Sequence, residues 1–125
     1  MNNSTIDRFP TKDSVHLALK EWQQVEPSSS PFSELLLFQL ACNETGMTVS
    51  DATDHVLKQG LDVMDAEGEK GHQYVTVLEM RFLANHPAHQ VAVALAVAEG
   101  SVYRLQAAAV ERLTTVLQGL DARAH

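Results

Sequence analysis

Residues 90–113, QVAVALAVAEGSVYRLQAAAVERL, decide the fold of this chain. They place a small residue, Ala92, where a second helix would cross the first one closely. An apolar residue, Val97, follows in a short turn, and a β-branched residue, Val102, comes early in the next helical segment. A helix-turn-helix needs these three features, because its two helices share a small core beneath a tight turn. The stretch therefore predicts a short helix, a turn and a longer helix.

Apolar residues recur at helical spacing along most of the remaining chain,. We expect six helices, over about 12–25, 31–43, 48–65, 73–84, 88–96 and 99–120. Two prolines and three serines predict a break between Glu26 and Pro31,. Val75, Thr76 and Val77 are β-branched and leave a short strand as the local alternative. The predicted fold class is all-α, with about six helices and a long last one.

The net negative charge comes from the first part of the chain. Residues 1–71 carry twelve Asp and Glu against five Lys and Arg, whereas residues 72–125 carry four of each. We expect a flexible lead-in (1–10), an acidic helical half (11–71) and a helix-turn-helix half (72–121), the two halves forming one compact domain. The inner faces of the predicted helices should bury Leu36, Leu40, Leu78, Phe82, Val91, Leu95, Val102 and Leu113.

Several functional classes find no support in the sequence. No apolar run approaches the roughly 20 residues that span a bilayer, and the polar N-terminus lacks a secretory signal, so we expect a cytoplasmic protein. Cys42 is the single cysteine and lies in the most apolar segment, where a buried, inert thiol is expected,. His86 and His89 flank Pro87 without a third ligand, which favours a surface loop over a metal site. The sequence predicts no enzyme, no metal and no cofactor.

The pattern VA..L.V...SVYR.Q..A...L resembles region 4 of bacterial sigma factors and the related output domains of transcriptional regulators. The resemblance covers Gln73–Leu120 and includes the Arg81-Phe82 pair in the preceding helix. The whole chain is also similar to N-terminal segments of large bacterial signalling ATPases and regulators, which pair a leucine-rich stretch like SELLLFQLA with a later SVYRLQ-like helix. The first resemblance implies a DNA-binding transcriptional regulatory module.

In that interpretation the helix starting near Glu99 enters the major groove. Six residues are then candidate DNA contacts: Ser101, Tyr103, Arg104, Gln106, Arg81 and Arg112. The first two would contact phosphate or sugar, the next two would reach base edges, and the last two would be peripheral phosphate contacts.

The sequence departs from the family pattern at Ala96, where Gly or Asn is usual, and at Ala98, where a capping Ser or Thr is common. The alternative function is a helical adaptor domain that binds a protein, as one part of a larger signalling ATPase. Residues 107–109, all alanine, suggest a homodimer seam along the last helix. Surface charge separates the two functions: Arg81, Arg104 and Arg112 should converge on one face for DNA, and scatter among glutamates for an adaptor.

Overall fold

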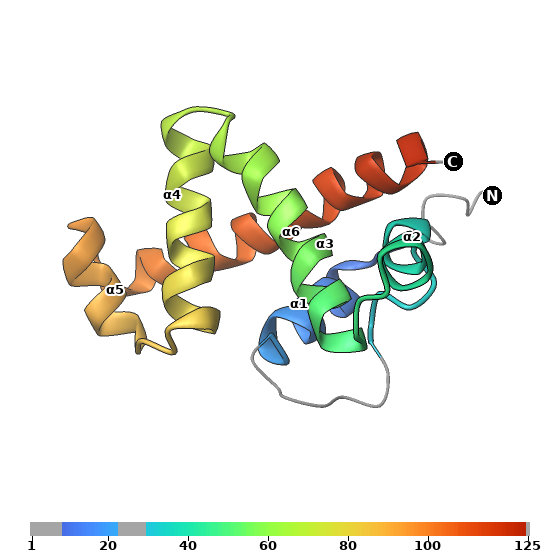
Figure 1. Ribbon diagram of the computed structural model, residues 1–125. Coiled ribbons are helices and arrows are strands. Elements are labelled where there is room, and N and C mark those ends of the chain that lie inside the picture. The colour runs from blue at the N-terminus through green and yellow to red at the C-terminus, as the bar shows by residue number, and fades with distance from the viewer. Residues whose placement is uncertain (1–8, 23–29, 125) are drawn as a thin grey trace.

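The computed structural model describes residues 9–22 and 30–124, and the regular structure in these ranges is entirely helical (Figure 1). In chain order the helices are α1 (Lys12–Lys20), α2 (Leu36–Thr45), α3 (Val49–Asp65), α4 (Glu69–Leu78), α5 (Ala88–Leu95) and α6 (Glu99–Ala124). A π-helical turn, η2 (Glu79–Leu83), continues α4. The predicted all-α class with six helices and a long last helix is therefore confirmed for the described residues. The strand alternative is wrong, because residues 75–77 lie in α4.

Local side-chain and backbone interactions mark the ends of several helices. The side chain of Thr48 accepts a hydrogen bond from the backbone N–H of Asp51 (3.1 Å) and caps α3,. Gly46 ends α2 in the left-handed conformation (φ 71°) that glycine adopts without a steric penalty,. Thr11 and Ser14 form a capping box at the start of α1,.

The apolar helix α2 begins at Leu36, five residues later than predicted. Ser30 holds the preceding segment in a turn, because its hydroxyl accepts a hydrogen bond from the N–H of Phe32 (3.1 Å) and another from the hydroxyl of Thr53 (2.7 Å),. The N-terminus of α2 is then capped from a distance, since the N–H of Leu37 donates to the carboxylate of Asp121 (3.1 Å) in α6. The late start of α2 therefore depends on tertiary contacts and not on local helix propensity.

Three other helix boundaries also differ from the prediction. The helix expected to reach Val25 ends at Lys20, and the predicted break at Glu26–Pro31 falls mostly in residues 23–29, outside the described residues. Helix α4 starts at Glu69, which shortens the predicted loop, and α6 continues beyond Leu120 to Ala124.

Helix α6 organises the fold, because it packs against all five other α-helices. Its first turns and α5 lie at one end of the molecule, whereas α2 lies towards the other end (Figure 1). A helix of this length spans about 39 Å, so one face can serve two separate apolar clusters. The arrangement carries α5 and the start of α6 away from the bulk of the acidic half.

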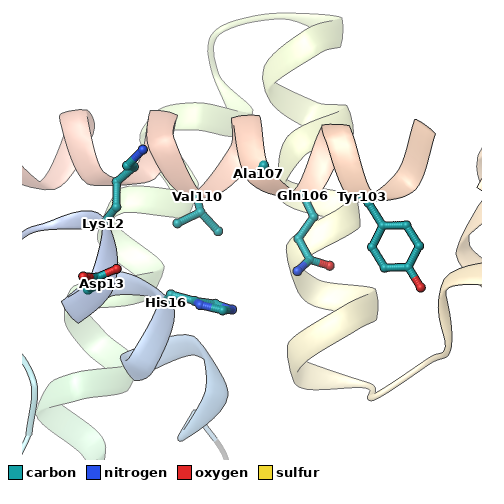
Figure 2. Close-up of a pocket in the computed structure, with 7 residues that line it drawn as sticks. All are labelled: Lys12, Asp13, His16, Tyr103, Gln106, Ala107 and Val110. Carbon is teal, nitrogen blue, oxygen red and sulfur yellow. The ribbon is translucent and has the colours of Figure 1, made fainter. Parts of the chain in front are cut away.

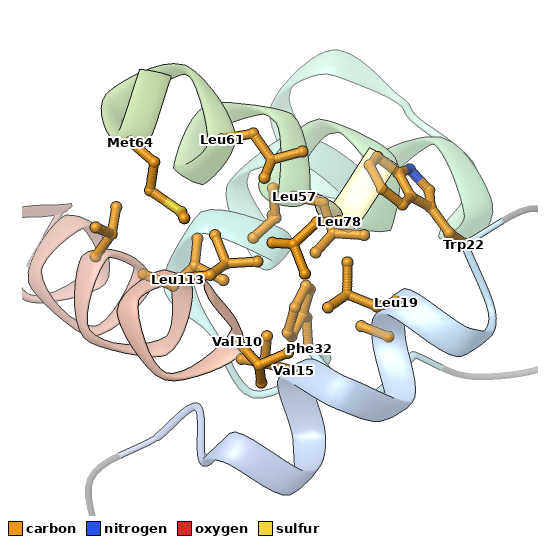
Figure 3. Packing of buried hydrophobic residues seen from close by; sticks show 14 of the residues in the cluster. Val15, Leu19, Trp22, Phe32, Leu57, Leu61, Met64, Leu78, Val110 and Leu113 are labelled. Carbon is orange, nitrogen blue, oxygen red and sulfur yellow. The ribbon is translucent and has the colours of Figure 1, made fainter. Parts of the chain in front are cut away.

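The main core joins α1, α2, α3, α4 and α6 (Figure 3). Its largest fully buried side chains are Phe32, Leu19, Leu35, Leu57, Met64, Leu78, Leu113 and Leu117. A second, smaller cluster beneath the predicted helix-turn-helix consists of Val77, Ala88, Val91, Ala92 and Val102. The motif therefore has its own small core, and α6 is long enough to contribute side chains to both clusters.

The predicted core residues divide evenly between buried and half-buried positions. Those that are buried are Leu78, Val91, Val102 and Leu113. Those that are only half-buried, contrary to prediction, are Leu36, Leu40, Phe82 and Leu95. In α2 the register differs: Phe38 and Ala41 enter the core, and Leu36 and Leu40 lie about 200° around the helix from Phe38,. An almost wholly apolar sequence does not specify which of its faces is the inner one.

Candidate functional site

The helix-turn-helix motif is formed by α5, residues 96–98 and the first turns of α6. Ala92 in α5 and Val102 in α6 are buried as predicted, and Val97 in the turn is half-buried over their cluster. The N–H of Val97 donates to the carbonyl of Ala92 (3.0 Å) and closes the turn. Ala96 adopts the left-handed conformation with φ 58°. Ala96 therefore has the backbone conformation that glycine adopts without a steric penalty,.

Replacing Ala96 with glycine should raise the free energy of unfolding by up to about 1 kcal/mol, because an L-residue with a Cβ is strained at positive φ. Urea denaturation of the two proteins measures the difference. The control is Ala94→Gly, which places glycine inside α5 at an exposed site and should cost about 1 kcal/mol. Equal losses for both variants would show that residue 96 is not left-handed.

Arg81 makes three contacts with other residues of the chain. Its Nε donates to Oε1 of Gln106 (2.8 Å), and its NH1 donates to the carbonyl of His86 (3.2 Å). The guanidinium also lies over the ring of Tyr103, 5.7 Å from the centroid. The structure therefore brings together three predicted DNA contacts, Arg81, Tyr103 and Gln106, but they bind one another and Arg81 is half-buried.

Gln106 and Tyr103 line a shallow groove between α1 and α6, with His16 and Lys12 on the opposite wall (Figure 2). Lys12 also pairs with Glu111 of α6 (3.6 Å). The groove carries both signs of charge, because Asp13 also lines it. It presents no consistently basic surface to a phosphate backbone.

Ser101 and Arg104 lie on another side of α6. The NH2 of Arg104 donates to the hydroxyl of Ser101 (2.9 Å), and both line a groove against α4. Arg104 and Gln106 are two positions apart, which places them about 200° apart around the helix. The two predicted base-reading residues therefore do not face one groove of DNA together.

Arg112 is paired with Glu67, which follows α3. Its Nε donates to Oε1 of Glu67 (3.1 Å), and its NH2 bonds the other carboxylate oxygen. The hydrogen bonds from Arg112 hold the pKa of Glu67 below its ordinary value and raise the pKa of Arg112 itself. Arg112 lies about 12 Å along α6 from Arg104. The two residues are 45 positions apart in the sequence, so no local pattern predicts that they pair.

The exposed surface of the motif is largely uncharged. Val93 in α5 is 82% exposed and Tyr103 in α6 is 52% exposed. The other exposed small residues nearby are Ala94, Ala96, Ala98, Gly100 and Ala107. Ala109 is fully buried in the main core, so the alanine run is divided between core and surface. The homodimer along this run stays a prediction.

Within residues 9–22 and 30–124, no three His, Cys, Asp or Glu side chains gather as metal ligands would. The Nδ1 of His86 lies 2.9 Å from the amide oxygen of Gln90, within hydrogen-bonding distance. Cys42 is half-buried, and so more accessible than predicted. No described helix has the length and apolar character that crossing a bilayer requires.

No protein-family model matches the chain, and neither a curated protein nor a solved structure shows significant similarity to it. The functional proposal therefore rests on the geometry of the motif.

Proposed function

We propose that this chain is a helical adaptor domain whose helix-turn-helix end binds a protein partner. One observation carries the proposal: Arg81, Arg104 and Arg112 do not form one cationic cluster. Arg81 is bonded to Gln106, whereas Arg104 and Arg112 lie about 12 Å apart along α6 and Arg112 is paired with Glu67,. All three donate hydrogen bonds to acceptors of the same chain, and the acceptor of Arg112 is a carboxylate.

The physical reason concerns phosphate contacts, which supply most of the affinity of a DNA-binding protein. Such contacts need several cations on one surface. Here the exposed stripe at the start of α6 offers Arg104 together with Glu99, on a chain of net charge −7. Long-range repulsion between the acidic half and the phosphates would oppose the approach of DNA.

The uncharged surface of the motif supports a protein partner. Val93 in α5 and Tyr103 in α6 are exposed large side chains, and exposed apolar surface gains free energy when another apolar surface covers it,. Tyrosine is enriched at the energetic centres of protein interfaces. Tyr103 is also held in place by the guanidinium of Arg81, which reduces the side-chain entropy that binding would cost,.

A DNA-binding transcriptional regulatory module is the alternative, because the motif has a helix-turn-helix order of helices and exposes Tyr103 and Arg104 in the first turns of α6. In this function Arg104 would reach a guanine edge. Because few cations are available, such a module would make few phosphate contacts. Its affinity for DNA should then depend only weakly on salt concentration.

Photo-cross-linking distinguishes the two functions. A photoreactive amino acid at Val93 should give a cross-linked adduct of defined mass in cell extracts of the source organism. The adduct should survive nuclease and disappear after protease. The matched control is the same amino acid at Asp62, an exposed position on α3, which should give none.

The DNA arm of the test uses fluorescence anisotropy with a selected pool of random duplexes between about 50 and 200 mM salt. We expect no enriched sequence. An enriched duplex whose affinity falls about 10- to 100-fold in Arg104→Ala would contradict the adaptor proposal and establish the DNA-binding alternative.

A further inference from the structure

A second groove lies between α4 and the first half of α6. It has a volume of about 400 Å³ and is lined by Lys70, Gln73, Tyr74, Val97, Ser101, Arg104, Leu105 and Ala108. Its residues come from segments that are separated by more than twenty positions in the sequence, so the groove exists only in the folded chain.

The polar lining of this groove consists of hydrogen-bond donors and contains no carboxylate. Lys70 stands at one wall, its Nζ 5.4 Å from the centroid of the Tyr74 ring. Arg104 stands at the other wall, positioned by its hydrogen bond to Ser101. Gln73 adds an amide on the α4 wall. The groove is therefore cationic although the chain as a whole carries a net charge of −7.

The two cations differ from three other basic residues of the described chain. Lys12, Lys58 and Arg112 each lie within 4 Å of a carboxylate of this chain. Within residues 9–22 and 30–124, neither Lys70 nor Arg104 has such a partner, and both side chains are exposed. Their charges are thus available to an external anion.

Carbon atoms form much of the remaining wall. Val97 and Leu105 are half-buried and border the small cluster beneath the motif, and Ala108 leaves room beside them. A phosphate backbone would satisfy the cations but would leave this apolar wall uncovered. A peptide with a carboxylate next to an apolar side chain would satisfy both.

We propose that the groove between α4 and α6 binds an acidic, amphipathic segment of the protein partner. Lys70 and Arg104 pair with its carboxylates, and an apolar side chain of the same segment packs on Val97 and Leu105. This inference rests on the proposed adaptor function, because it specifies the chemistry that the partner presents to this domain.

The test is a selection of random 12-residue peptides displayed on phage against the full chain. Enriched peptides should carry Asp or Glu within four residues of Leu, Ile or Phe. Their affinity, measured by anisotropy of the fluorescein-labelled peptides, should fall at least tenfold in Lys70→Glu/Arg104→Glu. The matched control is Lys20→Glu/Arg123→Glu, which makes the same change of net charge at exposed positions outside the groove. This control should retain the affinity of the parent chain.

Thermal melting followed by circular dichroism first establishes that both double variants fold. Peptides without acidic residues, peptides that bind both double variants equally, or no enrichment at all would each overturn the inference. So would a DNA duplex whose binding is lost in Lys70→Glu/Arg104→Glu. A negative peptide selection would not by itself contradict the adaptor function. The cross-linker at Val93 tests partner binding through α5, outside this groove.

Discussion

Replacing Gly71 with alanine is expected to lower the free energy of unfolding by about 3 kcal/mol or more. A Cβ at this position would lie 1.9 Å from the carbonyl oxygen of Met64 and 3.0 Å from its carbonyl carbon. Both are backbone atoms at the end of α3, so no side-chain rotation relieves the overlap. The first turn of α4 would have to move away from α3, and buried contacts between the two helices would be lost.

Urea denaturation with constant m-value measures this loss. Gly119→Ala is the matched control, because Gly119 lies inside α6 and a Cβ there would meet no atom within 4 Å. Alanine is the better helix former, so the control should gain up to about 1 kcal/mol. If Gly71→Ala gained stability as the control does, the close approach of α3 and α4 at Met64 would be wrong.

The sequence predicted the features that local signals determine. The small and β-branched residues of the motif, Ala92 and Val102, follow from spacing and side-chain chemistry within a few residues. In the structure Gly60 allows α6 to approach, since a Cβ there would lie 2.5 Å from Cδ1 of Leu113.

Features that depend on distant residues were not predictable in this way. The start of α2 depends on Asp121, and the fate of one predicted DNA contact, Arg112, depends on Glu67. Each partner is far away in sequence and becomes a neighbour only after the helices pack. The sequence grouped the candidate residues around one motif, and only the fold shows that Arg81 bonds Gln106 whereas Arg112 pairs with Glu67.

Replacing Leu113 with alanine is expected to cost about 2–5 kcal/mol, the range for a fully buried leucine whose site collapses incompletely. Leu113 is 0% exposed and belongs to the main core (Figure 3). It also fills the space beside Gly60, where α3 offers no side chain of its own. Neither backbone can close the resulting cavity easily, because α6 is held by five other helices.

Leu95→Ala is the matched control for the Leu113 substitution, and it removes the same atoms from the smaller cluster under the motif. Leu95 is half-buried, so less apolar surface returns to water and the cavity opens towards solvent,. We expect about half the loss seen for Leu113→Ala, measured in the same urea titrations. Equal losses would mean that the cluster beneath the helix-turn-helix contributes as much per side chain as the main core. The end of the molecule that we assign to partner binding would then be as resistant to local opening as the acidic half, whereas the burial pattern makes it the less protected end.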